Sequence, residues 1–178
     1  MADELSSTYL NKNPLIRIFS RGKVKLALKI ADLKKTDIIL DFGCGGGWLK
    51  NNLKNQDYNI IGYDITPEHS DVKDYRKIKT KPNKIFVMDV FEHIPKEQIR
   101  EIINNFKKLN QNFELITSIP TENLVSRKAR KILGKSEKVS GHITPLKEIL
   151  QILREERLIL VKRINFLTVS YVAKFRSR

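Results

Sequence analysis

A cluster of glycines directly after an acidic residue is the part of the sequence whose chemistry is easiest to interpret. Asp41-Phe42-Gly43-Cys44-Gly45-Gly46-Gly47 follows an apolar run and precedes a short amphipathic stretch. Glycine permits backbone conformations that other residues avoid, and it lets a ligand lie directly on the main chain. The free amides at the start of a following helix can meet a polar ligand. The segment therefore predicts a ligand-binding turn between a strand and a helix.

The spacing of the glycines separates several ligand classes. A dinucleotide-binding turn has the pattern G-x-G-x-x-G, in which Trp48 would stand at the third glycine. A phosphate-binding P-loop needs Gly-Lys followed by Ser or Thr, and this turn lacks that sequence. The remaining pattern is D-x-G-x-G-x-G, which is matched by Asp41, Gly43, Gly45 and Gly47.

Further acidic and imidazole side chains lie at the ends of predicted elements. Asp64 follows the first glycine of the turn by about 20 residues, where a carboxylate can accept hydrogen bonds from both hydroxyls of a ribose. Asp89 ends a central strand and is expected to face the crevice at the carboxyl edge of the sheet. Glu92 and His93 begin a turn into a helix, where capping or packing is an alternative role. His142 precedes the last helix.

The elements that must position these residues alternate between short apolar runs and amphipathic stretches, which is typical of a parallel α/β sheet. Gly22 is expected to break or bend the first helix, Thr144 to cap the last one, and a tight turn near Asn165 to join the two closing strands. The predicted strands are 37–42, 58–63, 84–89, 113–119, 158–164 and 166–174, and the predicted helices are 14–31, 48–55, 96–109 and a last one after Thr144. At most one short strand is expected at 72–75.

Four stretches of the chain resemble motifs of the class I S-adenosylmethionine-dependent methyltransferases. Residues 40–49 are similar to the first motif, LDxGCGxGxL, and residues 61–65 to the second. Residues 89–94, after the predicted strand 84–89, resemble the stretch that follows the family's fourth strand. Residues 141–144 resemble the stretch before the family's last helix. The resemblance implies a Rossmann-like α/β fold with helices on both faces. Its mostly parallel sheet would have seven strands, or six if the third is lost, and an antiparallel C-terminal strand.

The resemblance also implies the cofactor, S-adenosylmethionine, with S-adenosylhomocysteine as the product. Asp41 would hold the ammonium end of the methionine, and Asp64 would bind the ribose. The family usually has a helix and a strand after the second motif, but this stretch is compressed here. Asp74 is its best candidate for the adenine amino group, although a solvated loop aspartate fits as well. The residues expected to bind the cofactor are Asp41, Gly43, Cys44, Gly45, Gly46, Gly47, Asp64, Ile65, Asp74 and Asp89.

The implied reaction is methyl transfer to an acceptor, for which His142, Asp89 and His93 are the candidate catalytic residues. In the family, enzymes that methylate amino groups of nucleic acids and proteins often have N-P-P-Y after the fourth strand. The corresponding position here, after the predicted strand 84–89, lacks it, and this favours a small-molecule or lipid acceptor. The basic segment 127–138 lies between the predicted strand 113–119, the fifth strand of the family, and the last helix, and it would suit an anionic acceptor if it covers the substrate mouth. Two alternatives stay open: an RNA or protein methyltransferase, and a non-catalytic protein that binds the cofactor or a partner.

Composition sets broader limits on partners and location. The formal net charge of +14 attracts polyanions, so nucleic acid stays a possible partner beside a small-molecule acceptor. The three histidines lack HxxxH or CxxC partners, so we expect no metal ion. The absence of a secretory signal and of a membrane-spanning run predicts a cytoplasmic protein, without excluding peripheral membrane contact. We expect a single methyltransferase domain over residues 1–178, with an N-terminal helical cap at 1–35 and the core at 36–178.

Overall fold

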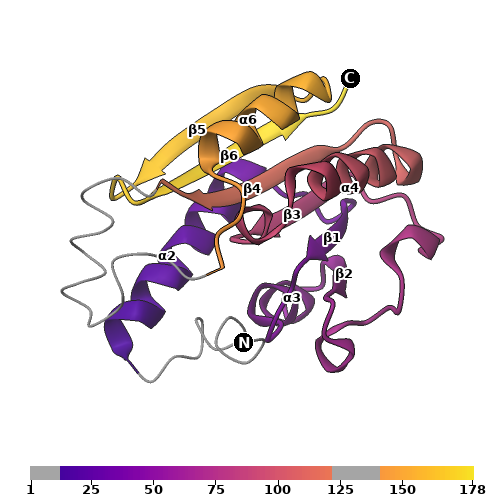
Figure 1. Cartoon of the computed structure of the whole chain (residues 1–178). Coiled ribbons are helices and arrows are strands. Elements are labelled where there is room, and N and C mark those ends of the chain that lie inside the picture. Colours follow the sequence, from indigo (N-terminus) through magenta and orange to yellow (C-terminus); the bar gives the residue numbers. More distant parts are fainter. Residues whose placement is uncertain (1–12, 122–140) are drawn as a thin grey trace.

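The short runs rich in β-branched and aromatic residues form one six-stranded sheet. A computed structural model describes residues 13–121 and 141–178 of the 178-residue chain. The strand order is β2-β1-β3-β4-β6-β5 (Figure 1). The strands are β1 (Ile38–Phe42), β2 (Asn59–Tyr63), β3 (Lys84–Met88), β4 (Glu114–Pro120), β5 (Ile159–Phe166) and β6 (Ser170–Arg176).

The pairing of the strands confirms the predicted α/β sheet. β1 pairs in parallel with β2 and β3, and β3 pairs in parallel with β4. β6 runs antiparallel to both β4 and β5. The family's third strand is absent from the described sheet, which therefore has six strands and β2 at its edge. The expected strand at 72–75 does not form. The segment between β2 and β3 instead holds two short 3-10 turns, η1 (Pro67–His69) and η2 (Tyr75–Lys77).

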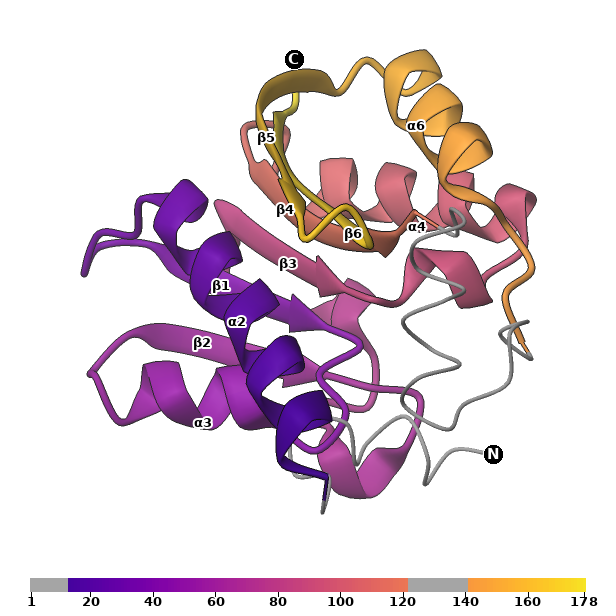
Figure 2. The same ribbon diagram turned by 90° about the vertical axis from the view of Figure 1, so that its left-hand side faces the viewer.

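Helices cover both faces of the sheet and divide the core into two layers. α2 (Pro14–Ala31) and α3 (Trp48–Lys54) lie on one face, and α4 (Lys96–Leu109) and α6 (Leu146–Glu155) lie on the other (Figure 2). The first layer packs apolar side chains of α2 and α3 on one set of alternate strand residues. The second packs those of α4 and α6 on the other set. This alternation is what a parallel sheet buried on both sides requires.

α2 is one continuous helix of 18 residues, and the expected break at Gly22 is wrong. A glycine inside a helix costs roughly 0.5–1 kcal/mol relative to alanine, so its presence needs a reason. A Cβ placed on Gly22 would lie 2.9 Å from Cζ of Phe166, at the end of β5. The missing side chain therefore lets an aromatic ring pack on the helix backbone. None of the helices in the described ranges has the length and apolarity needed to span a bilayer.

Two further local expectations are corrected near the end of the chain. α6 begins at Leu146 with Pro145 at its cap, and the Thr144 hydroxyl instead donates to the Ile94 carbonyl at 2.7 Å. The turn between the closing strands lies at residues 167–169 rather than near Asn165. Leu167 and Thr168 adopt positive φ there, at 50° and 59°. The first difference arises from a contact between segments that are distant in the sequence.

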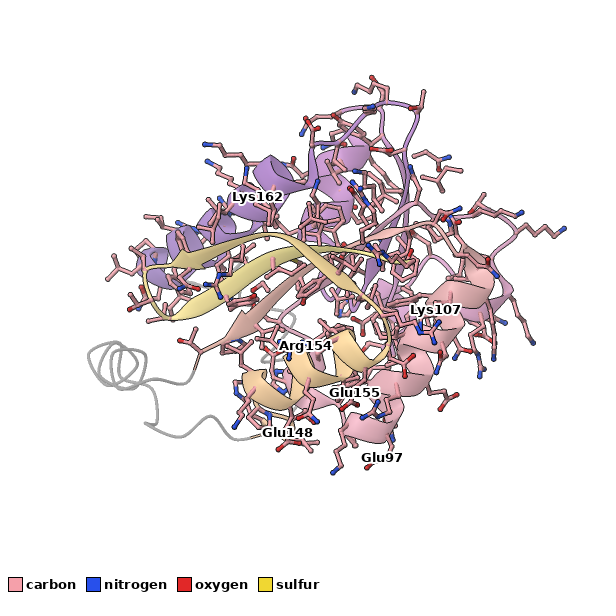
Figure 3. The ribbon with its side chains drawn as sticks, turned by 90° about the horizontal axis from the view of Figure 1, so that it is seen from above. Glu97, Lys107, Glu148, Arg154, Glu155 and Lys162 are labelled. Atoms are coloured by element: carbon pink, nitrogen blue, oxygen red, sulfur yellow. The ribbon has the colours of Figure 1, made fainter. Side chains whose placement is uncertain are left out.

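Ion pairs join α4 to α6 on the surface of the second layer. Glu155 of α6 pairs with Arg100, and Lys107 of α4 lies 2.8 Å from Glu156. Figure 3 shows Lys107 on α4 and Glu155 on the neighbouring α6. Exposed pairs of this kind contribute about 0–1 kcal/mol each, so they add little to the stability that apolar packing provides. The apolar cluster that α4 and α6 share therefore holds α6 against α4.

Candidate functional site

The glycine turn between β1 and α3 has the backbone geometry that only glycine adopts readily. Gly43, Gly45 and Gly47 have φ of 75°, 47° and 72°. A Cβ on Gly43 would lie 2.4 Å from Cγ2 of Val90, so the turn also packs tightly against the segment after β3. The Gly43 amide donates to the Tyr63 carbonyl at 2.7 Å. The turn is thereby fixed to the carboxyl end of β2.

Asp64 lies directly after β2, and its carboxylate faces the glycine turn. Oδ2 of Asp64 accepts a hydrogen bond from the Gly45 amide at 2.8 Å, and Oδ1 accepts one from the Thr66 amide at 2.9 Å. The Asp64 amide donates to Oγ of Ser70 at 3.1 Å. Each carboxylate oxygen can accept a second hydrogen bond. The structure thus brings Asp64 and the turn together, with Ile65 exposed beside them.

Asp41, the last residue but one of β1, is a buried carboxyl group. The residue is 3% exposed, and Oδ2 of its carboxyl group has no hydrogen-bond partner in the described protein. Burial raises the pKa of Asp41 to about 7, against the nearby Lys50 ammonium, which lowers it. A buried polar atom without a partner costs free energy and needs an explanation. An ammonium group of a ligand held on the turn would supply the missing partner.

Lys50 and Asp71 support the outer side of the turn, and the sequence analysis missed both. Lys50 Nζ lies 2.9 Å from Oδ1 of Asp71 and donates to the His69 carbonyl at 3.1 Å. Partial burial acts to raise the pKa of Asp71, but hydrogen bonds from the Gly62 amide and the Lys50 ammonium lower it overall. Asp71 falls in no predicted strand or helix, so its place beside β2 had no signal in the sequence.

Asp74 lies beside β2 but is engaged by its own segment. Its carboxylate accepts two hydrogen bonds from the Arg76 guanidinium, at 2.8 and 3.0 Å, and one from the Arg76 amide. The Arg76 guanidinium holds the pKa of Asp74 below its usual range. Asp74, Ile61 and Ile78 are among the residues lining an open hollow of about 540 Å³ next to the edge strand. Contact of Asp74 with adenine stays a prediction.

Asp89 follows β3 at the carboxyl edge of the sheet, as the sequence predicts. Its φ of 56° is uncommon for a residue with a side chain. The carboxylate forms an ion pair with Lys23 of α2 and accepts a hydrogen bond from the Ser118 hydroxyl of β4. Lys23 was missed, although a signal exists. It falls on the apolar stripe of α2, three residues after Ser20 and four before Ala27, and is buried.

The two candidate catalytic histidines lie side by side, although they are far apart in sequence. The rings of His93 and His142 have centroids 4.9 Å apart and planes at 75°. Nδ1 of His93 lies 2.9 Å from the Gly141 carbonyl. His93 ends the short 3-10 turn η3 (Phe91–His93), which begins directly after Val90, the residue packed on the glycine turn. The histidines are therefore next to the segment that contacts this turn.

Cys44 packs within the turn, where its thiol is largely buried. The residue is 6% exposed, and burial raises the pKa of its thiol to about 12. The thiol donates to the His69 carbonyl at 3.3 Å. A thiol that stays protonated is a poor nucleophile, and this agrees with a packing role. The basic segment 127–138, expected near the mouth of the site, lies outside the described residues.

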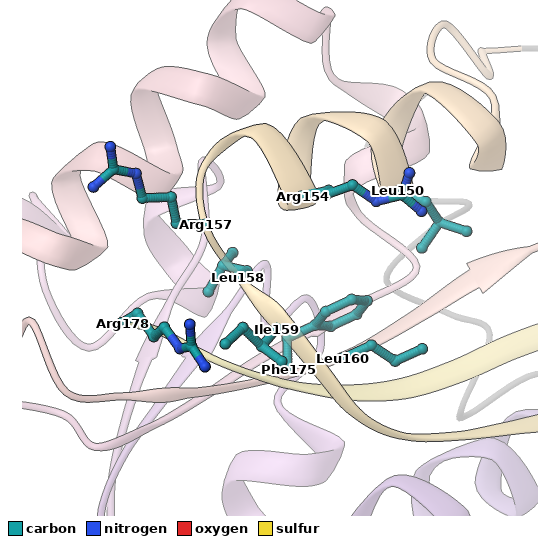
Figure 4. A pocket seen from close by; sticks show the side chains of 8 residues that line it. All are labelled: Leu150, Arg154, Arg157, Leu158, Ile159, Leu160, Phe175 and Arg178. Atoms are coloured by element: carbon teal, nitrogen blue, oxygen red, sulfur yellow. The ribbon is translucent and has the colours of Figure 1, made fainter.

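A larger hollow lies away from these residues. It has a volume of about 660 Å³ and lies between α6 and strands β5 and β6 (Figure 4). Its lining includes Leu158, Phe175 and Arg178, which lie near the amino ends of the parallel strands. Ligands of open α/β sheets bind at the carboxyl ends. We therefore assign the functional site to the glycine turn and not to this hollow.

Comparison with known proteins agrees with this assignment. The family model described as a methyltransferase domain matches residues 15–158, which is most of the chain. No curated protein matches the sequence significantly. Among solved structures, a SAM dependent methyltransferase from Aquifex aeolicus aligns with a TM-score of 0.68 at 13% identity, covering 99% of this chain and 97% of that one.

A second similar structure is the magnesium protoporphyrin IX methyltransferase from Synechocystis PCC 6803 with bound SAH. It aligns with a TM-score of 0.64 at 18% identity, covering 91% of this chain and 85% of that one. At such identities the likeness establishes a shared fold. Together with the family model and the glycine turn, it shows that the chain belongs to the class I S-adenosylmethionine-dependent methyltransferase family.

Proposed function

We propose that this methyltransferase transfers a methyl group from S-adenosylmethionine to a small acceptor that carries an anionic group. The observation that carries the proposal is the Asp64 carboxylate beside the glycine turn, 2.8 Å from the Gly45 amide, with the buried Asp41 close to the same turn. The net charge of +14 supports an anionic acceptor. The sequence Asp89–Glu92, in place of N-P-P-Y, supports a small one.

The residues of the turn fit the cofactor group by group. Asp41 would hold the ammonium, which supplies the partner that its buried Oδ2 lacks. Asp64 would accept the ribose hydroxyls, and the backbone of residues 43–47 would line the methionine and ribose. S-Adenosylmethionine supplies a methyl group that its sulfonium has already activated. The protein mainly has to hold the acceptor in line, and positioning of this kind is worth roughly 7–11 kcal/mol.

Residues on the opposite side of the turn would position the acceptor. Asp89, His93 and His142 lie on the segments after β3 and before α6, which meet near Val90. Lys23 and Ser118 hold the Asp89 carboxylate, so Asp89 would act by orienting groups around it rather than by moving freely. His93 or His142 would accept a proton from an acceptor that must lose one.

Calorimetric titration with S-adenosylhomocysteine tests the ribose assignment. We expect the wild-type chain to bind, and Asp64→Asn to weaken binding at least tenfold, because each hydrogen bond to a charged group is worth about 1.5–3 kcal/mol. Asp57→Asn is a matched control. Asp57 is exposed between α3 and β2, at the opposite end of the strand, with a φ of 57° that asparagine tolerates. Equal affinities for Asp64→Asn and the wild type would remove the assignment.

A further inference from the structure

One cluster of metal-ligating side chains lies beside the proposed site. Among residues 13–121 and 141–178, Glu92, His93 and His142 place one possible ligand atom each within 4.8 Å of the other two. Glu92 and His93 come from η3, and His142 comes from the segment before α6. The sequence gives no sign of the cluster, because 48 residues separate His93 from His142 and no recognised ligand spacing is present.

Backbone contacts fix the orientation of His93. The Gly141 carbonyl lies 2.9 Å from Nδ1 of His93 and can only accept a hydrogen bond, so Nδ1 carries the proton. Nε2 then presents its lone pair away from the carbonyl. A histidine that binds a metal almost always has its other nitrogen held in this way.

A second set of backbone contacts fixes the segment that carries His142. The Glu92 carbonyl accepts hydrogen bonds from the Ile143 amide at 2.7 Å and from the Thr144 amide at 3.2 Å. The Thr144 hydroxyl donates to the Ile94 carbonyl at 2.7 Å. The two segments are therefore held together by main-chain contacts that do not use the candidate ligand atoms of Glu92, His93 and His142.

The burial of the carboxylate also favours a cation. Glu92 is 2% exposed, and burying a charged group is costly unless opposite charge or hydrogen bonds compensate. A divalent ion bound next to the carboxylate would supply opposite charge directly. Two imidazoles with one carboxylate are ligands that Zn²⁺ and other divalent transition-metal ions accept.

We propose that Glu92, His93 and His142 bind one divalent transition-metal ion. Ligand atoms about 2.1 Å from an ion in tetrahedral geometry are about 3.4 Å apart, so side chains whose ligand atoms lie within 4.8 Å of one another need to close by up to about 1.4 Å. Rotation of the Glu92 and His142 side chains would supply this closure while His93 keeps its contact with the Gly141 carbonyl. Three protein ligands leave at least one open coordination position, which is typical of sites that bind a substrate rather than of closed structural sites.

The location of the ion suggests what the open position would take, and this step rests on the proposed function. Val90 packs on Gly43, and η3 follows it directly, so the cluster adjoins the glycine turn. An ion there would bind an acceptor through an anionic or hydroxyl oxygen and lower the pKa of a hydroxyl that it binds. With the ion bound, this effect would replace the proton acceptance proposed above for His93 or His142, because their ring nitrogens would hold the ion. The acceptor would therefore belong to the class of small molecules with an oxygen that coordinates metal ions.

Titration of the tag-free, chelator-treated full chain with ZnCl₂ tests the site. We expect one equivalent to bind, and CoCl₂ to give a visible absorption band from a nitrogen and oxygen ligand set. Glu92→Gln and His142→Ala should each weaken Zn²⁺ binding at least tenfold. Two controls, His69→Ala in η1 and the exposed Glu148→Gln in α6, should bind as the wild type does. His142 is only half-buried, so its variant should fold even if that of Glu92 does not, and circular dichroism checks both.

Two results would overturn the metal site: no stoichiometric Zn²⁺ binding by the wild type, or wild-type Zn²⁺ affinity in the folded His142→Ala variant. Titration of the same metal-free protein with S-adenosylhomocysteine separates this inference from the proposed function. Cofactor binding without Zn²⁺ binding would overturn the metal site alone. Zn²⁺ binding without cofactor binding would support the metal site and contradict both the proposed function and the acceptor class.

Discussion

Asp41 is the side chain whose chemistry departs furthest from its behaviour in water. Its carboxyl group has an ordinary pKa of 3.8, and burial raises this value to about 7. The group is therefore about half ionised at neutral pH in the protein without ligand. An ammonium group that arrives on the turn favours the ionised form, because opposite charges stabilise each other strongly in a buried site. Cofactor binding and ionisation of Asp41 should thus be coupled.

This coupling predicts that the affinity for S-adenosylhomocysteine depends on pH. Below pH 7 the ionised fraction of Asp41 falls about tenfold per pH unit, so the affinity should fall by up to about tenfold per unit between pH 7 and 5.5. Above pH 7 it should level off. Asp41→Asn should bind S-adenosylhomocysteine more weakly than the wild type at pH 8. Its affinity should change little as the pH is lowered, because asparagine does not titrate. Calorimetric titrations across this range provide the measurement.

The Asp57→Asn variant is the control for general effects of pH on the fold, and it should keep the wild-type slope. A wild-type affinity that stays constant from pH 5.5 to 8 would contradict the role of Asp41. The same conclusion would follow if Asp41→Asn kept the wild-type pH dependence, because the titrating group would then lie elsewhere.

At the scale of elements, the turn between β1 and α3 depends on the segment that follows β3. The Cβ missing from Gly43 leaves the space that a methyl group of Val90 occupies. The turn contacts Val90, η3 follows Val90 directly, and the segment before α6 is hydrogen-bonded to η3. These three parts lie far apart along the chain. A change at the turn should therefore affect both the fold and the binding of the cofactor.

Gly43→Ala tests this dependence. A φ of 75° costs a residue with a side chain about 1–2 kcal/mol, and the new Cβ would also lie only 2.4 Å from Val90. We expect the variant to lose more than about 2 kcal/mol of unfolding free energy in urea denaturation, and to bind S-adenosylhomocysteine more weakly. Adding Val90→Ala should restore the part that is due to the contact. A Gly43→Ala chain as stable as the wild type would show that the turn is not held as described.

Much of the arrangement of elements could be predicted from the sequence, because it depends on local patterns. The apolar period identifies the strands and helices, and the helix at Lys96–Leu109 agrees with the structure at both ends. The break expected at Gly22 is wrong because the reason for that glycine is a ring from β5, which no local pattern reveals. The replacement of the third strand by η1 and η2 agrees with the compressed sequence there.

The site divides in the same way. The glycine turn, Asp64 and Asp89 could be located because each follows a strand, and parallel strands end at one edge. Lys50 and Asp71 could not, because their partners come from other elements. Lys23 was missed although its place on the buried face of α2 is a signal. The convergence of Glu92, His93 and His142 depends on how the segment before α6 docks on η3. Such docking follows from the whole fold and has no signature in residue spacing.

At the scale of the whole molecule, a six-stranded sheet presents the glycine turn near one edge. Since β2 is an edge strand, the side of the turn where the family places a third strand is formed by η1 and η2 with Asp71 and Asp74. The net charge of +14 surrounds the sheet with a field that draws anionic molecules toward it. Such a field speeds encounter and does not choose among acceptors. In the proposed function, the residues around His93 and His142 would make this choice.

A crystal structure of the chain grown with S-adenosylhomocysteine tests the central claim most directly. We expect the ligand to lie along the backbone of residues 43–47, with its ribose hydroxyls on the Asp64 carboxylate and its ammonium near Asp41. Ordered ligand bound elsewhere, such as the hollow between α6 and β5, with Asp64 still bonded only to the amides of Gly45 and Thr66, would contradict the account.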